Sequence, residues 1–270
     1  MKKLFLFLAL TIVLSSCTAP ASQPESTSGA GLTKIVVGAT EVPHSELLNL
    51  VKDDLEAQGI ELEITVFDGY ELINPSTSEK QLDANFFQHL PFLESYVKES
   101  GQDLVSIGAV HIEPLGIYSK KIDNLESLED GATVTIPNDE TNGARALLLL
   151  QASGLIKLKE GVTLTATIQD IAENSKNLEI YEQEAAMLPR SLDDAEVSVI
   201  NGNFALEAGL NPLTDALKLE DSTSPYVNVI AVRGEDAERP ELKALFEAIT
   251  SQEVKDYILE NYDGALIPVF

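Results

Sequence analysis

The stretch Leu104–Ser119 most constrains the fold, because it is a long, mostly apolar run that suits neither one strand nor a helix. It exceeds the usual strand length of about 3–10 residues, and its apolar positions lack a helical period. Pro114 and Gly116 interrupt it. We interpret the stretch as a strand leaving one lobe, a crossover, and a strand entering a second lobe. Pro225–Val232 is a second long apolar strand and provides the return crossover.

Strand patterns alternate with helix patterns along the rest of the chain, which indicates an α/β fold. Strands are predicted at residues 34–39, 60–67, 132–136, 164–168, 178–181 and 197–200, and helices at 44–58, 91–99, 143–151, 204–208, 240–250 and 252–260. Asp68–Gln81 is polar and is expected to form turns. Two crossings between two lobes place a cleft where the lobes meet, which is a common position for a small-molecule site.

The N-terminus has the pattern of a lipoprotein signal peptide. Lys2 and Lys3 precede an apolar run, Leu4–Leu14, that is too short to span a bilayer. Leu14-Ser15-Ser16-Cys17 then has the form of a lipobox, whose cysteine is acylated (palmitate included) when the signal peptide is removed. We predict a signal peptide at 1–16, a lipidated N-terminus and flexible tether at 17–33, and a protein anchored on the extracytoplasmic face of the cell membrane.

Composition excludes several functions. The formal net charge of −26 repels nucleic acid and anionic head groups, whereas a zwitterionic ligand is compatible with it. Cys17 is the only cysteine, so there is no intramolecular disulfide and no cysteine nucleophile or cysteine metal site. The three histidines lack HExxH spacing, and neither a nucleophile elbow nor a phosphate loop is present. We therefore predict no enzymatic activity, no cofactor and no metal.

The segment 83–92, DANFFQHLPF, combines aromatic rings with neutral amide and imidazole groups. We expect it to start a helix capped by Asp83, with residues three or four apart on one face. Such a surface suits the wall of a small-ligand pocket, although aromatic rings at a helix start more often belong to a core. Both interpretations remain open from these residues alone.

The segment 135–150, TIPNDETNGARALLLL, predicts a strand, a polar turn and an apolar helix. Thr141 or Asn142 can serve as the N-cap, which places Arg145 in or near the first turn. That end of a helix favours anions rather than cations, so Arg145 is more plausible as a clamp for a carboxylate than as a helix stabiliser. The alternative is a surface ion pair with Glu140 or Asp139.

Several motifs together resemble the methionine-binding lipoproteins of bacterial ABC importers, the NlpA/MetQ family. The matching stretches are DANFFQH (83–89), HIEPLGIYS (111–119), PNDETNGARALLLLQASGLIKLK (137–159), LPRSLDDAEV (188–197), INGNFALEAGL (200–210) and SPYVNVIAVR (224–233). They extend from about residue 33 to the C-terminus. The resemblance implies a two-lobed periplasmic-binding-protein-like fold of type II, with 34–114 plus 229–270 in lobe 1 and 115–228 in lobe 2.

The resemblance also implies a function. We expect a monomeric solute-binding protein that captures L-methionine between its lobes, closes around it by hinge motion near 113–117 and 225–229, and delivers it to an ABC transporter permease with its ATPase. The same scaffold could instead bind D-methionine, a methionine-containing dipeptide or another apolar amino acid. A surface lipoprotein acting as adhesin or antigen is the remaining alternative.

A buried amino acid needs partners for its carboxylate, its ammonium and its side chain. The matching motifs assign the carboxylate to Arg145 and suggest that Asn201 and Asn228 bridge carboxylate and ammonium, although isolated asparagines often serve as caps. Asn203 is a weaker candidate. Glu113 could accept from the ammonium or only pack at the hinge, and His89 could hydrogen-bond, stack or be a partly buried core histidine. The expected apolar wall consists of Tyr70, Phe86, Phe87, His89 and Phe92.

The chain departs from the family pattern at three places. Phe92 and Phe204 stand where relatives commonly carry tyrosine, and Ile73-Asn74 replaces the usual Pro-Asn pair. A lost hydroxyl removes a contact worth about 0.5–1.5 kcal/mol. That difference alters selectivity within a ligand class rather than the class itself.

Overall fold

The structure is a computed structural model and describes residues 31–221 and 224–270. The predicted signal peptide, the lipobox cysteine Cys17 and nearly all of the predicted tether lie outside the described residues. Within the described ranges, no helix has both the length and the apolar character needed to cross a membrane.

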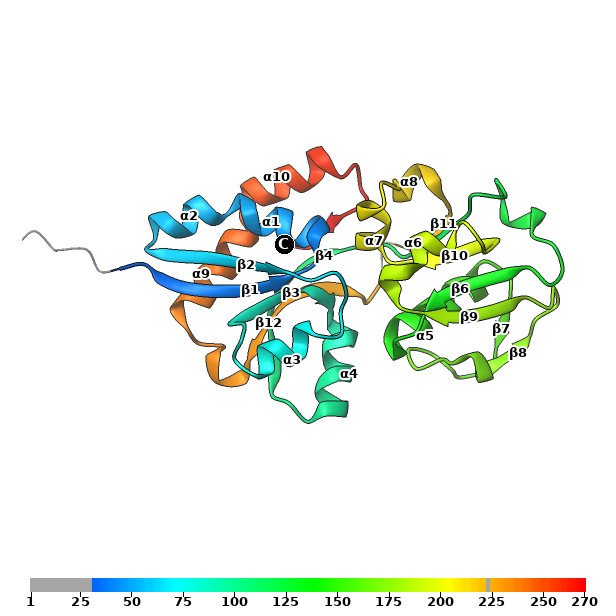
Figure 1. Cartoon of the computed structure of the whole chain (residues 1–270), viewed down its shortest axis with the longest axis horizontal. Helices are drawn as coiled ribbons and strands as arrows, with labels where there is room; N and C mark the ends of the chain where they lie inside the picture. The colour runs from blue at the N-terminus through cyan, green and yellow to red at the C-terminus, as the bar shows by residue number, and fades with distance from the viewer. Residues whose placement is uncertain (1–30, 222–223) are drawn as a thin grey trace, which may run out of the picture. The chain divides into compact units, whose positions relative to one another are not determined.

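A six-stranded sheet organises the N-terminal part of the chain together with its C-terminal end (Figure 1). Its strands, in spatial order, are β13 (Ile267–Pro268), β4 (Leu104–Ile112), β12 (Val227–Arg233), β3 (Ala84–His89), β1 (Thr33–Ala39) and β2 (Ile60–Val66). β1 pairs in parallel with β2 and β3. β12 lies antiparallel between β3 and β4, so a strand from late in the sequence completes the middle of the sheet.

Helices cover both faces of this sheet. The helical elements here are a π-type turn (Glu41–Ser45), α1 (Glu46–Leu50), α2 (Lys52–Ala57), α3 (Ile73–Ser78), α4 (Leu90–Ser100), a 3-10 turn (Gly234–Asp236), α9 (Pro240–Ile249) and α10 (Gln252–Asn261). Figure 1 shows α3 and α4 on the side opposite α1, α2 and α10. The main core includes Val37 of β1 together with Leu47 of α1, Leu55 of α2, Leu245 of α9 and Ile258 of α10.

A second, five-stranded sheet contains the middle of the chain. Its order is β11 (Ala216–Leu219), β5 (Gly116–Tyr118), β10 (Val197–Ile200), β6 (Thr133–Pro137) and β9 (Glu179–Gln183), with β7 (Lys157–Leu158) and β8 (Ile171–Glu173) forming a separate pair. The helices are α5 (Glu140–Ala152), α6 (Leu188–Ser191), α7 (Gly202–Glu207) and α8 (Pro212–Asp215), with 3-10 turns at Leu125–Ser127, Ile168–Asp170 and Ala185–Met187. Val134, Ile136, Leu147 and Leu150 belong to its core.

Two connections join the sheets, as the two long apolar stretches predict. β4 ends at Ile112 in the first sheet and β5 begins at Gly116 in the second. β11 ends at Leu219 in the second sheet and β12 begins at Val227 in the first. The predicted two-lobed α/β fold is therefore confirmed, with Pro114 in the first connection.

The prediction that the aromatic segment 83–92 starts a helix is wrong, because residues 84–89 form a strand. The Asp83 carboxylate accepts from the backbone N–H of Val36 at 2.8 Å instead of capping a helix. Pairing with β1 and β12 supplies the backbone partners of this segment. The following helix begins only at Leu90, and the His89 side chain caps it.

Two further elements differ from the sequence prediction. Residues 164–168 do not form a strand, because Thr167 and Asp170 exchange capping-box hydrogen bonds that start a 3-10 turn instead. Residues 68–81 contain α3, which the polar sequence concealed. Its Asn74 and Thr77 are buried and bond to side chains of β3, so polar residues here form part of an interior network.

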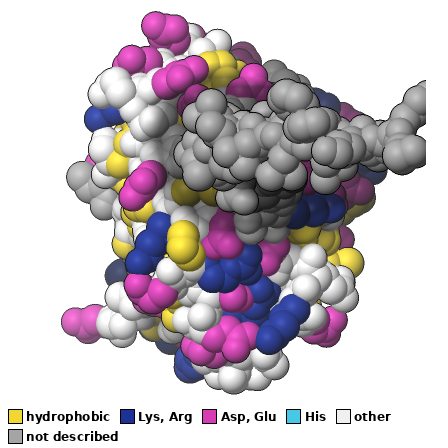
Figure 2. Space-filling view, turned by 90° about the vertical axis from the view of Figure 1, so that its left-hand side faces the viewer, with side chains coloured by type: hydrophobic (Ala, Val, Ile, Leu, Met, Phe, Trp, Pro, Cys, Tyr) yellow, Lys and Arg dark blue, Asp and Glu magenta, His cyan; other side chains and the backbone are white. Residues whose placement is uncertain are grey.

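The surface carries interspersed charge. Figure 2 shows acidic and basic side chains mixed over the face that it presents. Exposed ion pairs such as Lys34–Glu63 and Lys80–Glu235 illustrate the pattern. Such pairs contribute about 0–1 kcal/mol each, so their main effect is solubility.

Candidate ligand site between the two sheets

A small cavity lies between side chains of the two sheets. Its lining consists of Tyr70, Phe87, Gln88, His89, Phe92, Glu113, Asn142, Arg145, Asn201, Gly202, Asn203 and Asn228. Every ligand residue predicted from the sequence lies here except Phe86.

Phe86 lies in the core beneath the cavity. Its ring is fully buried, with centroids 4.7 Å from His44 and 5.5 Å from His111. Phe86 was predicted to line the ligand cavity, but the structure places its ring in the core instead. The sequence put Phe86 and Phe87 side by side, but the strand conformation of β3 sends the two rings to different clusters.

The aromatic wall is built around Tyr70. Its ring centroid lies 5.0 Å from Phe204, 5.7 Å from Phe87 and 5.8 Å from Phe92. Its hydroxyl donates to Asn203 Oδ1 at 2.6 Å. Desolvation by burial raises the pKa of Tyr70, so the hydroxyl stays protonated. The wall is thus apolar and carries no charge.

His89 links the aromatic wall to the second sheet. Its Nδ1 accepts from the backbone N–H of Phe92 at 3.1 Å, which leaves the ring proton on Nε2. Nε2 therefore donates to Asn142 Oδ1 at 3.0 Å. Burial, and then the charge of Arg145, lower the pKa of His89 to about 3. The imidazole is neutral at physiological pH.

Asn142 organises the polar side of the cavity. Its Oδ1 also accepts from Asn201 Nδ2 at 2.8 Å, and its Nδ2 donates to the Asp139 carboxylate at 3.0 Å. Asp139, and neither Thr141 nor Asn142, is the N-cap of α5, because its side chain accepts from the Asn142 backbone N–H. Sequence reasoning considered Asn142 only as a cap and missed its place in the cavity.

Two cavity asparagines each retain one buried polar atom without a hydrogen-bond partner in the described part of the chain. These atoms are Oδ1 of Asn201 and Nδ2 of Asn203. A buried polar atom without a partner costs about 1–3 kcal/mol. Since both residues line the cavity, a bound polar ligand can satisfy them.

Arg145 is buried and already holds several contacts. Its Nε lies 3.0 Å from Oε1 of Glu220, and Nη2 lies 2.5 Å from Oε2 of the same carboxylate. Nη2 also donates to the Glu113 carbonyl at 2.7 Å, and the guanidinium lies 4.4 Å from the centroid of the Tyr226 ring. Because α5 begins at Glu140, Arg145 lies in its second turn. Its ion-pair partner is Glu220, not Glu140 or Asp139.

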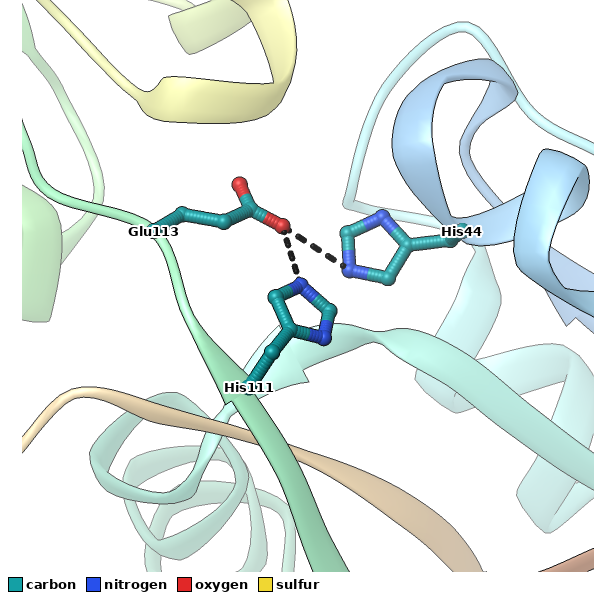
Figure 3. Close-up of side chains that lie close together, drawn as sticks. All are labelled: His44, His111 and Glu113. Carbon is teal, nitrogen blue, oxygen red and sulfur yellow. Dashed lines mark hydrogen bonds and ion pairs between the residues drawn. The ribbon is translucent and has the colours of Figure 1, made fainter. Parts of the chain in front are cut away.

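Glu113 meets two histidines at one edge of the cavity (Figure 3). Its Oε1 accepts from Nε2 of His111 at 2.7 Å and lies 3.3 Å from Nε2 of His44. Burial alone would raise the pKa of Glu113, but His44, the hydrogen bond from His111 and Arg145 together lower it, so the carboxylate is ionised. Oε2 points away from both rings and has no hydrogen-bond partner among the described residues.

Asn228 and Gly202 complete this edge. Asn228 Oδ1 lies 3.1 Å from His44 Nε2, which ties β12 to the turn that precedes α1. A Cβ atom on Gly202 would lie 2.8 Å from Cβ of Glu113 and 3.3 Å from its Oε2. The glycine therefore lets α7 approach Glu113 closely, and no sequence motif predicted that role.

The site presents a carboxylate, a guanidinium, asparagine amides and aromatic rings to one small cavity between two lobes. This combination defines the class of two-lobed solute-binding proteins. Residues 35–270 match the family model of the NlpA lipoproteins. The chain belongs to the NlpA lipoprotein family.

Individual relatives agree with this assignment. The chain is 39% identical over 274 residues to the methionine-binding lipoprotein MetQ of Bacillus subtilis, covering 100% of this chain and 99% of the relative. It is 43% identical over 235 residues to the D-methionine-binding lipoprotein MetQ of Salmonella typhi, covering 86% of each.

Solved structures are similar as well. A nutrient-binding protein of Burkholderia cenocepacia bound to methionine superposes with a TM-score of 0.85 at 45% identity, covering 87% of this chain and all of that one. A periplasmic substrate-binding protein of an ABC transporter from Coxiella burnetii gives 0.83 at 41%, with coverage of 87% and 100%. The chain is accordingly a substrate-binding lipoprotein and not an enzyme.

Proposed function

We propose that this protein binds L-methionine in the cavity between the two sheets and delivers it to an ABC transporter permease. The observation that carries the proposal is the placement of opposite charges on one small cavity. Glu113 and Arg145 both line it, beside the rings of Tyr70, Phe87 and Phe92. An α-amino acid with an apolar side chain matches all three features.

The ammonium group is assigned to Glu113. Both histidines contact Oε1, whereas Oε2 remains for a ligand. Asn228, which also lines the cavity, is the second acceptor that we assign to the ammonium. A charge-assisted bond to a carboxylate is about twice as strong as a neutral hydrogen bond, so Glu113 provides the main selectivity for amines.

The carboxylate group is assigned to Arg145. The contacts with Glu220 and the Glu113 carbonyl use Nε and Nη2. Within the described residues Nη1 makes no protein hydrogen bond, and a guanidinium has five donors. The Nη1 donors and Nδ2 of Asn203 are therefore the groups that we assign to the ligand carboxylate.

The methionine side chain is assigned to the aromatic wall. Sulfur contacts with ring edges contribute about 0.3–1.5 kcal/mol each. Phe92 and Phe204 make this wall more apolar than the tyrosine-bearing pattern of relatives, which favours a thioether over a polar side chain. D-methionine is the second candidate ligand, because the relative from Salmonella typhi is named for it.

The remaining parts of the proposal concern the whole protein. We propose lobe boundaries at 34–114 plus 229–270 and 115–228, hinge closure near 113–117 and 225–229, and a monomer anchored through Cys17 on the extracytoplasmic face. Support comes from the two connections between the sheets and from the lipoprotein family. Hinge closure around a ligand is an established mode of domain motion.

A thermal-shift screen tests the ligand assignment. Protein stripped of ligand by unfolding and refolding is mixed with each common amino acid, D-methionine and methionine dipeptides. A ligand at a hundred times its Kd adds about 2.7 kcal/mol of stability, which raises the Tm by roughly 5–10 °C at this size. A shift largest for L-methionine supports the proposal. A flat screen with folded protein would contradict it.

Delivery requires a separate test with the permease and ATPase in proteoliposomes. Uptake of labelled methionine should depend on added binding protein and on ATP. If uptake does not change when the binding protein is omitted, the delivery step is wrong even where methionine binds.

A further inference from the structure

The residues His44, His111 and Glu113 form a buried cluster of metal-binding side chains (Figure 3). Each residue offers one ligand atom, and these three atoms all lie within 4.8 Å of one another. They come from the turn before α1, from β4 and from the first connection between the sheets. The sequence separation of the histidines hid this convergence, and sequence analysis therefore predicted no metal.

We propose that this cluster binds one divalent transition-metal ion of the zinc class through His44, His111 and Glu113. Two imidazoles and one carboxylate are a common donor set for a zinc site that keeps a fourth position open. The asparagine oxygen Oδ1 of Asn228 lies 3.1 Å from His44 Nε2 and is therefore close to that position.

The geometry requires one adjustment. Both Nε2 atoms now point at Oε1 of Glu113, at 2.7 and 3.3 Å. Zinc bonds to nitrogen and oxygen are about 2.0–2.2 Å long, so the ion occupies the point on which the two rings converge and the carboxylate withdraws toward the cavity. Glu113 lines that cavity, so its side chain has space to move.

The surroundings of His44 suit a metal ligand. When Nε2 binds a metal, the ring proton resides on Nδ1 and needs an acceptor. Thr40 Oγ1 lies 2.8 Å from Nδ1 of His44. The edge-on ring of Phe86 holds the orientation of both imidazoles, with centroid distances of 4.7 and 5.5 Å. Both histidines are at most 1% exposed, so their rings have little freedom to turn away.

Zinc titration by calorimetry tests the proposal. The intact protein, purified without a polyhistidine tag and treated with a chelator, is titrated with zinc chloride alone in a non-chelating buffer. We expect one site per chain. His44→Gln and His111→Gln should each weaken zinc binding more than about 100-fold, beyond the 10- to 100-fold typical of an outer partner. Thr40→Val should weaken zinc binding by only about 10- to 100-fold, as expected for such an outer partner.

His89→Gln is the matched control. His89 is the remaining histidine of the chain and is also buried, but it lies outside the cluster. Its substitution should leave zinc affinity unchanged within about threefold. Circular dichroism establishes that each variant is folded. Absence of saturable zinc binding by folded wild-type protein, or binding that survives His111→Gln, would overturn the proposal.

A second readout uses the coupling between zinc and the ligand, and this part rests on the proposed function. Zinc on Oε1 reduces the negative charge that Glu113 offers to an ammonium. Saturating zinc should therefore weaken L-methionine binding, within the 5- to 150-fold range usual for coupled sites. Equal methionine affinity with and without bound zinc would overturn the shared use of Glu113. Failure of methionine binding in metal-free protein would instead contradict the proposed function alone.

Discussion

Nη2 of Arg145 lies 2.5 Å from Oε2 of Glu220, although 75 residues separate the two in sequence. The pair joins α5 to the segment after β11 and fixes the guanidinium beside the cavity. Because Glu220 already pairs with the guanidinium, Arg145 does not form the ion pair with Glu140 or Asp139 that the sequence allowed. The guanidinium is therefore oriented before any ligand arrives.

Arg145→Ala should weaken L-methionine binding at least about 30-fold, because truncating one member of a buried charge pair costs about 2–5 kcal/mol. Titration calorimetry on the folded variant measures the loss. Arg190→Ala is the control, since Arg190 lies on α6 and does not line the cavity. Methionine binding by Arg145→Ala at wild-type affinity would refute the assignment of the carboxylate.

Glu113→Gln should weaken L-methionine binding by about 10- to 100-fold, because a charge-assisted bond to the ammonium becomes a neutral one. The deaminated analogue 4-(methylthio)butanoate lacks the ammonium. Its affinity should fall less than that of methionine, or rise. Equal losses for the two ligands would show that Glu113 supports the cavity without contacting the ammonium.

Gly202→Ala should weaken methionine binding while leaving most of the stability intact. The added Cβ would lie 2.8 Å from Cβ of Glu113, so the glutamate or α7 must shift by several tenths of an ångström. Calorimetry should show a loss confined to ligands that carry an ammonium. Unchanged binding would mean that this edge of the cavity adapts without cost.

Substitutions at two phenylalanines should have different effects, one on protein stability and the other on methionine affinity. Phe86→Leu changes a fully buried ring and should lower the free energy of unfolding by about 1–3 kcal/mol, with methionine affinity nearly unchanged. Phe92→Leu changes a partly exposed wall residue and should weaken methionine binding up to about tenfold. Urea denaturation and calorimetry measure the two effects. The reverse pattern would contradict the placement of these rings.

Stability should fall in acid because of His89. Its pKa is about 3 in the folded protein and about 6.5 when unfolded. Between those values the unfolded chain binds the proton that the folded chain does not, so the free energy of unfolding decreases as pH falls, by up to about 1.4 kcal/mol per pH unit. From pH 7 to 5, His89→Gln should lose about 2 kcal/mol less than wild type. If wild type and His89→Gln lost the same unfolding free energy between pH 7 and 5, a group other than His89 would be responsible for the loss.

Much of the fold followed from the sequence because strand and helix periods are local. The long run at 104–119 resolved into β4, a connection at Pro114 and β5, as its apolar pattern and its breaks predicted. Gly59 and Gly209 ended α2 and α7 with positive φ angles of 82° and 77°. The helix start predicted at 83–92 was wrong because the conformation of this segment depends on pairing with distant strands. A local sequence pattern carries no information about such pairing.

The site was predicted unevenly for the same reason. The motifs indicate Arg145, Asn201 and Asn228, and all three line the cavity. The partner Glu220 and the convergence of His44 with His111 were missed, because both depend on tertiary contacts. Gln88 and Gly202 lie within two of the matching motifs but were not among the expected ligand residues. Phe86 is expected in the aromatic wall, but its ring lies in the core.

The most direct test is a calorimetric titration of L-methionine into ligand-stripped, metal-free protein. We predict saturable binding of one methionine per chain, with binding at least about 30-fold weaker for Arg145→Ala and about 10- to 100-fold weaker for Glu113→Gln. Folded wild-type protein that takes up no methionine, or that binds it equally well after both substitutions, would contradict the central claim.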